Sequence, residues 1–577
     1  MKRIVLLLLV TFITTFRMAA QTPFLKLFKA DGRTENNRLS KTSDGGYIHV
    51  GTVIYEDSIQ TKTNLVITKF DALLNVTWIK TYSDTVTITG GSGTFNILET
   101  NDSGYIVSTE TGGYASYQQP LTIFKIAGNG KLLWSKHIGF SPSSKHNFSA
   151  KTDMTLSNDG AVIITGNFYR NTAIQNFAQG GFLMKVSASD GNIEWFKSVE
   201  IKNDSSKSVF ANSVVCTKEG NYTLCGYTTN ARIGLNNYSP YIANYDINGN
   251  MIWQKFFTIA ENADFTRIKT TPDNGYIVTG GAFKKEASNA GDDYNLCAVK
   301  FNSLGDIEWA TQVKTKKLGI TRIKEIARSI YVNADSTYTI GGIYAKHKMS
   351  SSFLLKLNTD GSVEWINNIP SLNTQKPISI IDVYGTSDKG FLAGGNCFTN
   401  GNKSYLLLEK FNENGNSCSA QSGLEYQQTN LTNDTAIIET TSTNLAPFVI
   451  ESATALERNP VNYTITQLCT SLQEVATGNM ESISKTNIAT NSFSELSIAP
   501  NPVTNGVLNF KINNSEGNPL QLSVVSLQGT VMLKQNTEGF KGMVNKTVNV
   551  SSLAAGVYIL KVNVGRKQQM IKFIKVG

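Results

Sequence analysis

Residues 21–418 alternate short runs of apolar and polar residues with tight-turn sequences. Phrases such as SDGGYIHVG from Ser43 and PDNGYIVTG from Pro272 place an Asp-Gly or Asn-Gly pair directly before such a run. A period of two predicts half-buried β-strands, and these pairs favour tight turns between antiparallel strands. The pattern therefore predicts hairpins in which strand A precedes the turn and strand B follows it.

A second phrase in each period ends in tryptophan, as in KFDALLNVTW and KLNTDGSVEW. It predicts a strand C, a turn and a strand D that carries the tryptophan. A fixed period of 56–61 residues indicates one supersecondary unit copied many times. Each four-stranded unit is too small to bury both faces alone, so we interpret the tryptophans as packing between units. They are Trp78, Trp134, Trp195, Trp253, Trp309 and Trp365.

Seven A–B hairpins and seven C strands can be counted, but only six D strands carry tryptophan. The seventh copy, KFNENGNSCS from Lys410, ends where its strand D should begin. Phe24–Phe28 is similar to the other D strands and stands before the first strand A. An N-terminal strand that completes the last unit ties a ring shut and removes an exposed edge. The sequence therefore predicts an all-β protein with a seven-bladed β-propeller over residues 21–418.

The phrase D-x-x-G-x-x-x-W resembles the blades of quinoprotein-like propellers. Those enzymes typically have eight blades, and their set of cofactor-binding residues has no counterpart here, so no cofactor is expected. The turn motif T/S-x-D-x-G-aromatic, as in Thr42–Tyr47, half-resembles the Asp-box of sialidases. That box is itself a turn, so we expect a structural role for the motif.

The two ends of the chain indicate export. Residues 1–20 have a charged start, an apolar stretch of about 13 residues and a small-residue exit, which is typical of a secretory signal peptide. No apolar run reaches the roughly 20 residues of a membrane-spanning helix. Residues 419–493 are rich in Ser, Thr and Asn and predict a β-rich appendage and linker.

Residues 494–577 carry a PNP sequence at Pro500–Pro502, a Leu-Gln-Gly turn, the phrase LAAGVYIL and a KFIKVG terminus. In this order they resemble the type A C-terminal sorting domain of the type IX secretion system. From the strand and turn pattern we expect a small antiparallel β-sandwich. The resemblance implies contact with the secretion machinery, passage through the outer membrane and removal of the domain. The passenger would then be released or anchored at the cell surface.

The net charge of +9 is confined to these two ends. Residues 494–577 hold nine Lys or Arg and three Glu, and residues 1–20 hold three basic residues and no acid. The middle of the chain is therefore neutral, which argues against a nucleic-acid partner.

The six cysteines are expected to meet an oxidising compartment. Cys418 and Cys469 bracket the segment after the repeats and are the best disulfide candidates. We interpret the other four as buried strand residues: Cys216, Cys225, Cys297 and Cys397. No CxxC pair or His/Cys cluster indicates a metal site.

No HExxH or GxSxG sequence is present, so no catalytic residue is predicted. The B–C and D–A connections vary strongly in length, and variable loops on a rigid scaffold commonly carry function. Tyr and Arg in the B–C loops suit stacking and hydrogen bonding to sugars or peptides. The candidate binding residues on this loop face are Tyr117, Tyr169, Arg170, Arg232, Tyr238, Asp292, Asp293 and His347.

The leading hypothesis is a secreted or surface-displayed binding or adhesion protein that captures an extracellular polymer or protein and is not an enzyme. An extracellular glycan hydrolase or lyase remains open, because carboxylates from different blades converge only in three dimensions. A structural surface protein or motility accessory is a third alternative.

Overall fold

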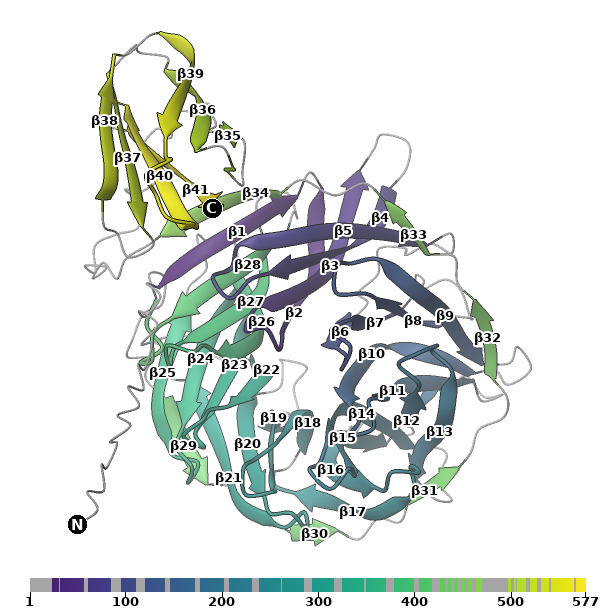
Figure 1. Cartoon of the computed structure of the whole chain (residues 1–577). Coiled ribbons are helices and arrows are strands. Elements are labelled where there is room, and N and C mark those ends of the chain that lie inside the picture. Colours follow the sequence, from purple (N-terminus) through teal and green to yellow (C-terminus); the bar gives the residue numbers. More distant parts are fainter. Residues whose placement is uncertain are drawn as a thin grey trace, which may run out of the picture. The chain divides into compact units, whose positions relative to one another are not determined.

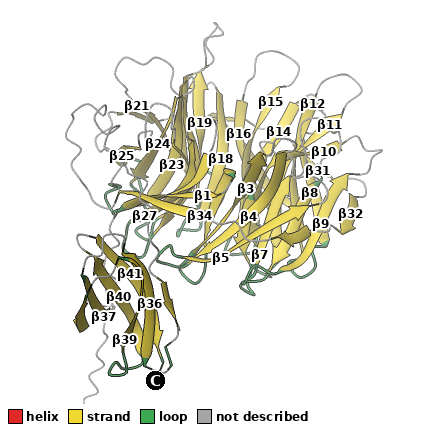
Figure 2. Cartoon of the chain, turned by 90° about the horizontal axis from the view of Figure 1, so that it is seen from above, coloured by secondary structure: helices red, strands yellow, loops and turns green. Residues whose placement is uncertain are grey.

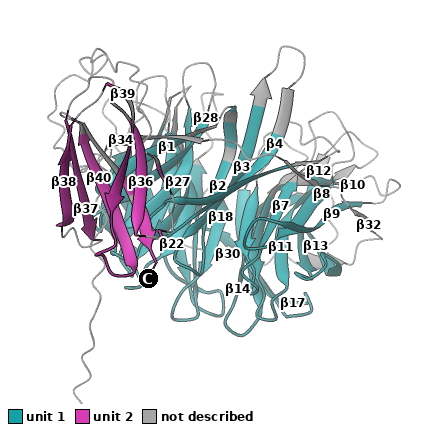
Figure 3. Ribbon diagram, turned by 45° about the horizontal axis from the view of Figure 1, so that its top comes forward, with its two compact units in different colours: residues 1–474 teal, residues 475–577 magenta. Residues whose placement is uncertain are grey.

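The computed structural model divides into two compact units, Met1–Glu474 and Val475–Gly577 (Figure 3). The structure describes residues 23–30, 32–56, 61–84, 95–110, 120–140, 146–171, 177–201, 207–230, 238–260, 262–284, 293–315, 324–346, 349–369, 378–398, 404–417, 426–430, 434–436, 440–443, 448–452, 455–458, 463–469, 497–499, 503–504, 506–514, 519–526, 531–538, 541–564 and 567–576. All regular elements in these ranges are strands. The predicted signal peptide lies outside the described residues.

The repeats of the first unit form seven antiparallel sheets of four strands, set around a common axis as in a β-propeller (Figure 1). Sheet 1 contains β2 (Arg33–Lys41), β3 (Tyr47–Glu56), β4 (Thr61–Phe70) and β5 (Val76–Asp84). Sheet 2 contains β6 (Asn96–Glu99), β7 (Tyr105–Glu110), β8 (Leu121–Ile126) and β9 (Leu132–Phe140). Sheet 3 contains β10 (His146–Leu156), β11 (Val162–Asn171), β12 (Phe177–Val186) and β13 (Ile193–Ile201). Sheet 4 contains β14 (Lys207–Cys216), β15 (Tyr222–Asn230), β16 (Tyr238–Tyr245) and β17 (Met251–Thr258). Sheet 5 contains β18 (Asn262–Thr270), β19 (Tyr276–Lys284), β20 (Asp293–Phe301) and β21 (Ile307–Thr315). Sheet 6 contains β22 (Lys324–Val332), β23 (Tyr338–Lys346), β24 (Met349–Leu357) and β25 (Val363–Ile369). Sheet 7 contains β26 (Ile378–Gly385), β27 (Phe391–Phe398), β28 (Ser404–Phe411) and β1 (Phe24–Ala30).

These sheets confirm the all-β class and the repeated four-stranded unit. Within each sheet, strands A, B, C and D follow one another from the axis outward. Strand A therefore lines the axis and strand D lies at the periphery. In Figure 2 the described turns of the first unit lie together at one end of the strands.

The N-terminal strand β1 supplies strand D of sheet 7, as the sequence predicts. It pairs antiparallel with β28, and Phe24 lies opposite Lys410. In sheet 1 the tryptophan occupies this register position, because Trp78 lies opposite Lys69. Phe24 therefore replaces the missing seventh tryptophan at the junction between sheets 7 and 1.

Each tryptophan packs on the sheet that follows it. Trp309 lies against Gly361, where an added Cβ would sit 2.6 Å from the indole, and its Nε1 donates to the carbonyl of Thr359 at 2.9 Å. Its ring centroid is 5.9 Å from that of Tyr338, the first residue of the next strand B. The glycine has a φ of 82°, in the region that favours glycine. The two sequence phrases thus interlock between neighbouring sheets, and the same contact joins Trp78, Trp134, Trp195, Trp253 and Trp365 to Gly130, Gly191, Gly249, Gly305 and Gly415.

The segment after the repeats, for which the sequence predicts a β-rich appendage and linker, contains six short strands. Its short strands pair antiparallel with the outer strands of six sheets, one after another (Figure 1). We call these six strands the outer belt. They run backwards around the sheets: β29 (Tyr426–Asn430) on sheet 5, β30 (Asp434–Ala436) on sheet 4, β31 (Thr440–Thr443) on sheet 3, β32 (Phe448–Ser452) on sheet 2, β33 (Ala455–Arg458) on sheet 1 and β34 (Tyr463–Cys469) on sheet 7.

The sequence predicts β structure in this segment but not its pairing with the sheets, because each strand is only three to seven residues long and gains its hydrogen bonds from a distant sheet. It covers edges that would otherwise offer unpaired backbone groups to other chains. Within the described residues, sheet 6 alone keeps four strands.

The second unit contains two sheets. One has the order β35 (Ser497–Ala499), β36 (Val507–Asn514), β39 (Gly542–Asn549), and the other has the order β38 (Val531–Thr537), β37 (Leu520–Ser526), β40 (Gly556–Val564), β41 (Lys567–Lys575). Residues from both sheets, among them Phe510, Leu522 and Phe573, form one buried cluster. The alternating apolar positions of these strands therefore build a core of their own.

The structure tests the predicted burial of four cysteines but not the predicted disulfide. Cys225, Cys297 and Cys397 are buried, as predicted, but Cys216 is only half-buried. Cys216 lies opposite Tyr222, and Cys225 lies opposite Ser213, so the two cysteines are not a directly opposed pair on their hairpin. Cys418 lies outside the described residues, as does the side chain of Cys469, so their disulfide stays a prediction. No helix in the described ranges is long and apolar enough to span a membrane.

Candidate functional site

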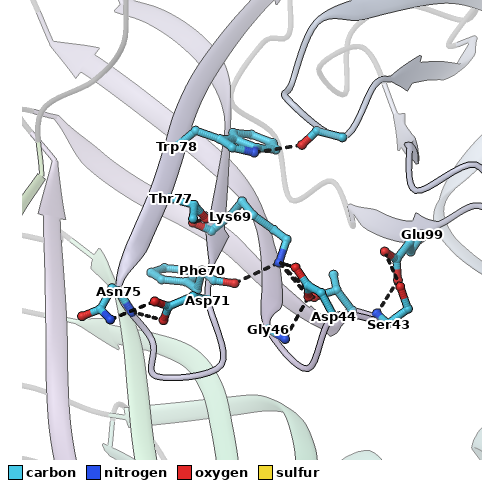
Figure 4. Close-up of polar contacts among 12 residues, drawn as sticks. Ser43, Asp44, Gly46, Lys69, Phe70, Asp71, Asn75, Thr77, Trp78 and Glu99 are labelled. Carbon is cyan, nitrogen blue, oxygen red and sulfur yellow. Dashed lines mark hydrogen bonds and ion pairs between the residues drawn. The ribbon is translucent and has the colours of Figure 1, made fainter. Parts of the chain in front are cut away.

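The A–B turns hold a recurrent polar cluster, shown for sheet 1 in Figure 4. The buried ammonium of Lys69 lies 2.8 Å from a carboxylate oxygen of Asp44, and Thr42 and the amide of Gly46 also donate to Asp44. Five other sheets repeat the ion pair: Lys125–Asp102, Lys185–Asp159, Lys300–Asp273, Lys356–Asp335 and Lys410–Asp388. Sheet 4 has Asn244 and Glu219 at the two positions.

Every donor in this cluster comes from the same sheet as the aspartate, so the cluster fixes the hairpin. Burial alone would raise the pKa of Asp44, but the bonds from Lys69, Thr42 and Gly46 lower it to about 2. At Asp102 the hydrogen bond from Lys125 is the largest cause of a pKa of about 2. The aspartates are ionised turn residues, in agreement with the structural role expected for the motif.

The inner strands, by contrast, carry an irregularity that aims side chains toward the axis. A β-bulge interrupts the A–B pairing in six of the seven sheets, for example between Phe265 and Arg267 and between Ile380 and Asp382. A bulge bends its strand and redirects the next side chain. The residue at which regular pairing resumes after each bulge lies four or five positions before the first residue of the turn motif.

The position four residues before the turn motif is polar in all seven sheets. These seven residues line one cavity of about 440 Å³, and we call them the axial ring. They are Arg38, Asn96, Asp153, Ser213, Arg267, Ser329 and Asp382. Tyr331, Tyr384 and Lys269 line the same cavity. Because Lys269 and Thr270 are exposed, the cavity opens toward the A–B turns.

Axial-ring side chains also tie neighbouring inner strands together. Asp153 accepts from the amide of Val214 at 3.2 Å, and Ser329 accepts from the amide of Val383 at 3.0 Å. The same pattern joins the last sheet to the first, because the amide of Leu39 donates to Asp382 at 2.9 Å. The ring therefore contributes to the packing of the sheets as well as lining the cavity.

The four charged members of the ring are not equivalent. Arg38 and Asp382 form a two-pronged ion pair, with Nε to Oδ2 at 2.9 Å and Nη2 to Oδ1 at 3.0 Å. Burial alone would lower the pKa of Arg38, but the charge of Asp382 and its hydrogen bonds raise it above the ordinary value. Asp153 accepts a hydrogen bond from Ser213 at 2.6 Å. Arg267 instead donates to two backbone carbonyls, those of Arg328 and Thr266, at 3.1 and 3.2 Å.

The loop residues predicted as binding candidates are mostly beyond the described part of the chain. Tyr117, Arg232, Asp292 and His347 lie outside the described residues, as do the side chains of Arg170 and Asp293. Tyr169 is 37% exposed. Tyr238 is half-buried in an aromatic row, with ring centroids 5.2 Å from those of both Tyr227 and Phe283. Because most of the candidate side chains lie outside the described residues, the loop-face site stays a prediction.

The axial ring was missed because its residues share no local motif. The available signal was a position that stays polar in every repeat, four residues before the turn, inside a strand that otherwise alternates. No group of His, Cys, Asp or Glu among the described residues could hold a metal ion.

The second unit can be assigned by comparison with known families. Residues 497–576 match the family described as "Secretion system C-terminal sorting domain". This sorting domain directs export through the outer membrane to the cell surface or the extracellular space, and it contacts the secretion machinery. The match covers the second unit and leaves the repeat sheets unassigned. No curated protein has a sequence that matches the chain.

Among solved structures, the chain is similar to an α-L-arabinanase of Penicillium chrysogenum, with 7% identity and a TM-score of 0.36 over 57% of this chain and 96% of that one. It is also similar to the NanB sialidase of Streptococcus pneumoniae, with 8% identity and a TM-score of 0.37 over 69% and 96% of the two chains. A polysaccharide lyase gives 10% identity and a TM-score of 0.39 over 65% and 89%. Likenesses at these TM-scores carry no conclusion about function.

Proposed function

We propose that the seven sheets of the first unit close into a seven-bladed β-propeller that binds an extracellular polymer, a glycan or a protein, in its axial cavity. The second unit is then a β-sandwich that delivers the propeller to the cell exterior, and residues 1–20 are a signal peptide. One observation carries the binding proposal: the axial ring is polar in all seven sheets and lines a cavity of about 440 Å³. A position used only for packing would be expected to hold apolar residues in several repeats.

The cavity suits a polar ligand better than an apolar one. Its lining includes Ser329, Tyr331, Tyr384, Asn96 and two arginines. The hydroxyl of Tyr384 donates to Leu39 and the amide of Asn96 donates to Thr152, so these two groups offer a ligand their oxygen acceptors. Binding sites of this kind use a few converging polar groups to fix the orientation of the ligand. Sugar hydroxyls and peptide groups both match such an array.

A second candidate function is cleavage of an extracellular glycan, favoured by the presence of Asp153 and Asp382 in one cavity. Paired carboxylates are the usual catalytic groups of glycoside hydrolases. Here Asp382 is fully engaged by Arg38 and Leu39, and Asp153 accepts from Ser213 and Val214. Both carboxylates therefore have structural partners, which favours binding over cleavage as the first proposal.

The experiment is a glycan and polymer binding array on the secreted full chain, followed by a reducing-end assay on every glycan that binds. Binding without new reducing ends supports the first proposal. Turnover that Asp153→Asn or Asp382→Asn abolishes, with circular dichroism unchanged, replaces it by the second. If no glycan, polymer or protein binds at the cavity, neither proposal holds.

A further inference from the structure

The axial ring contains two arginines, Arg38 and Arg267. Arg38 is paired with Asp382, whereas the guanidinium of Arg267 has no carboxylate within ion-pair distance among the described residues. Its Nε donates to the carbonyl of Arg328 at 3.1 Å, and its Nη1 donates to the carbonyl of Thr266 at 3.2 Å. A guanidinium carries five N–H donors, so these bonds fix its plane and use two of them. The remaining donors find no acceptor in the described part of the chain and are available to a ligand in the cavity.

The surroundings of Arg267 add positive charge. Arg38 and Arg328 act on it electrostatically, and Lys269 lines the same cavity two residues further along β18. Burial is the largest cause of the lowered pKa of Arg267, and the charge of Arg38 lowers it further, against the opposite effect of Asp153 and Asp382. A cation that has no carboxylate in direct contact is costly for folding when it is partly buried. Such costs are commonly retained where a ligand of the opposite charge binds.

The two aspartates limit the charge that the ligand can carry. Asp382 already neutralises Arg38, and Asp153 lies in the same cavity. A singly charged planar anion gains two parallel hydrogen bonds from one guanidinium, which is the geometry that arginine offers to carboxylates. A dianion would meet stronger repulsion from the aspartates. The neutral hydroxyl and amide groups of the ring then match the hydroxyls of a sugar.

We propose that Arg267 binds the carboxylate of a uronic acid residue, so that the ligand of the cavity is an acidic extracellular polysaccharide. This inference rests on the proposed binding function and gives it a ligand class. Arg267 is the specificity-determining residue, and Lys269 at the open end of the cavity adds attraction for the polyanion.

The test is isothermal titration of the secreted full chain with three oligosaccharides of equal length: an oligouronate, its carboxyl-reduced neutral form and a sulfated neutral form. The oligouronate should bind most tightly. Arg267→Gln should weaken its binding by about 10- to 100-fold, the range expected for hydrogen bonds to a charged group. Arg267→Lys keeps the charge but loses the paired donors of the guanidinium. Its affinity for the oligouronate should lie between those of the unmodified protein and Arg267→Gln. Lys131→Gln removes an exposed cation outside the cavity and should change binding by less than about twofold.

The outcomes distinguish failure of the carboxylate inference from failure of the proposed binding function. Equal binding of the oligouronate and its neutral form, or unchanged oligouronate binding by Arg267→Gln, overturns the carboxylate inference while leaving polymer binding intact. Preference for the sulfated form overturns it in the same way. Failure of every oligosaccharide to bind removes the inference. Binding of another polymer or a protein at the cavity in the binding array of the proposed function would still keep that function. Circular dichroism of each variant excludes loss of folding as the cause.

Discussion

The junction between sheets 7 and 1 offers a direct test of the interlock between neighbouring sheets. Elsewhere a tryptophan packs on a glycine of the next C–D turn, but here Phe24 takes the tryptophan position and Leu74 takes the glycine position. Leu74 has a φ of 61°, which is unusual for a non-glycine residue, and it is only 3% exposed. Both side chains belong to one buried cluster. We infer that the smaller phenyl ring leaves the space that the leucine fills.

The magnitudes follow from these contacts. Phe24→Trp overfills the site and should cost about 2 kcal/mol in the free energy of unfolding. Leu74→Gly removes the side chain that fills the site, and the lost packing should cost about 3 kcal/mol. Glycine tolerates the positive φ, which offsets about 1 kcal/mol, so the net cost is about 2 kcal/mol. Without coupling, the double variant would lose about 4 kcal/mol. With the tryptophan–glycine contact restored, we expect a loss of about 1–2 kcal/mol, a coupling of roughly 2–3 kcal/mol.

The assay is urea unfolding followed by tryptophan fluorescence. All six tryptophans belong to the first unit, so the signal reports the repeat sheets and not the sorting domain. Leu73→Gly is the matched control, because Leu73 is the neighbouring residue but is 56% exposed. It should show no coupling to Phe24→Trp. Losses of the Phe24→Trp and Leu74→Gly variants that add to within about 0.5 kcal/mol would refute the interlock.

Three further predictions concern other parts of the first unit. Gly361→Ala brings a Cβ to 2.6 Å from an indole at a φ of 82° and should cost about 1–3 kcal/mol in urea unfolding, whereas Gly139→Ala meets nothing within 4 Å and should be neutral. The depressed pKa of Asp102, about 2, means that its pairing stabilises the fold fully above the unfolded pKa of about 4 and that this stability is lost as the pH falls toward 2. Since Asp102 is largely exposed, the change is below about 1 kcal/mol, and Lys125→Met should reduce it in acid titrations of stability. A chain that ends at residue 417 lacks the outer belt and should scatter light by self-association, while a chain that ends at residue 474 should stay monomeric.

Much of the fold could be predicted because its signals are local. The Asp-Gly turn before Tyr47 and the alternation after it define one hairpin within about ten residues, and the same chemistry recurs in each repeat. The displaced strand at Phe24 was predictable for a similar reason, since its resemblance to other D strands could be read beside a gap at Lys410. The outer belt was not, because Asp434–Ala436 is too short to be a strand until it meets the edge of β17.

The candidate site depended on distance in space. Arg38 and Asp382 are 344 residues apart, and nothing near either one indicates the other. The loop-face residues were the more obvious binding candidates in the sequence, because Tyr and Arg, which are typical of binding sites, cluster there, as at Tyr169 and Arg170. A repeat-by-repeat comparison could show that one inner-strand position is always polar, but not that its seven members face one cavity.

The sequence by itself determined the repeated four-stranded unit, its turns, the completing N-terminal strand and the sorting domain, because each rests on contacts between residues close in the chain or on a copied motif. Only the tertiary structure decided the order of the outer belt, the place of the cavity and the pairing of its charges. Those features arise where different repeats meet. Whether a charge such as Arg267 is neutralised depends on which side chains the closed arrangement of sheets brings within a few ångströms of it.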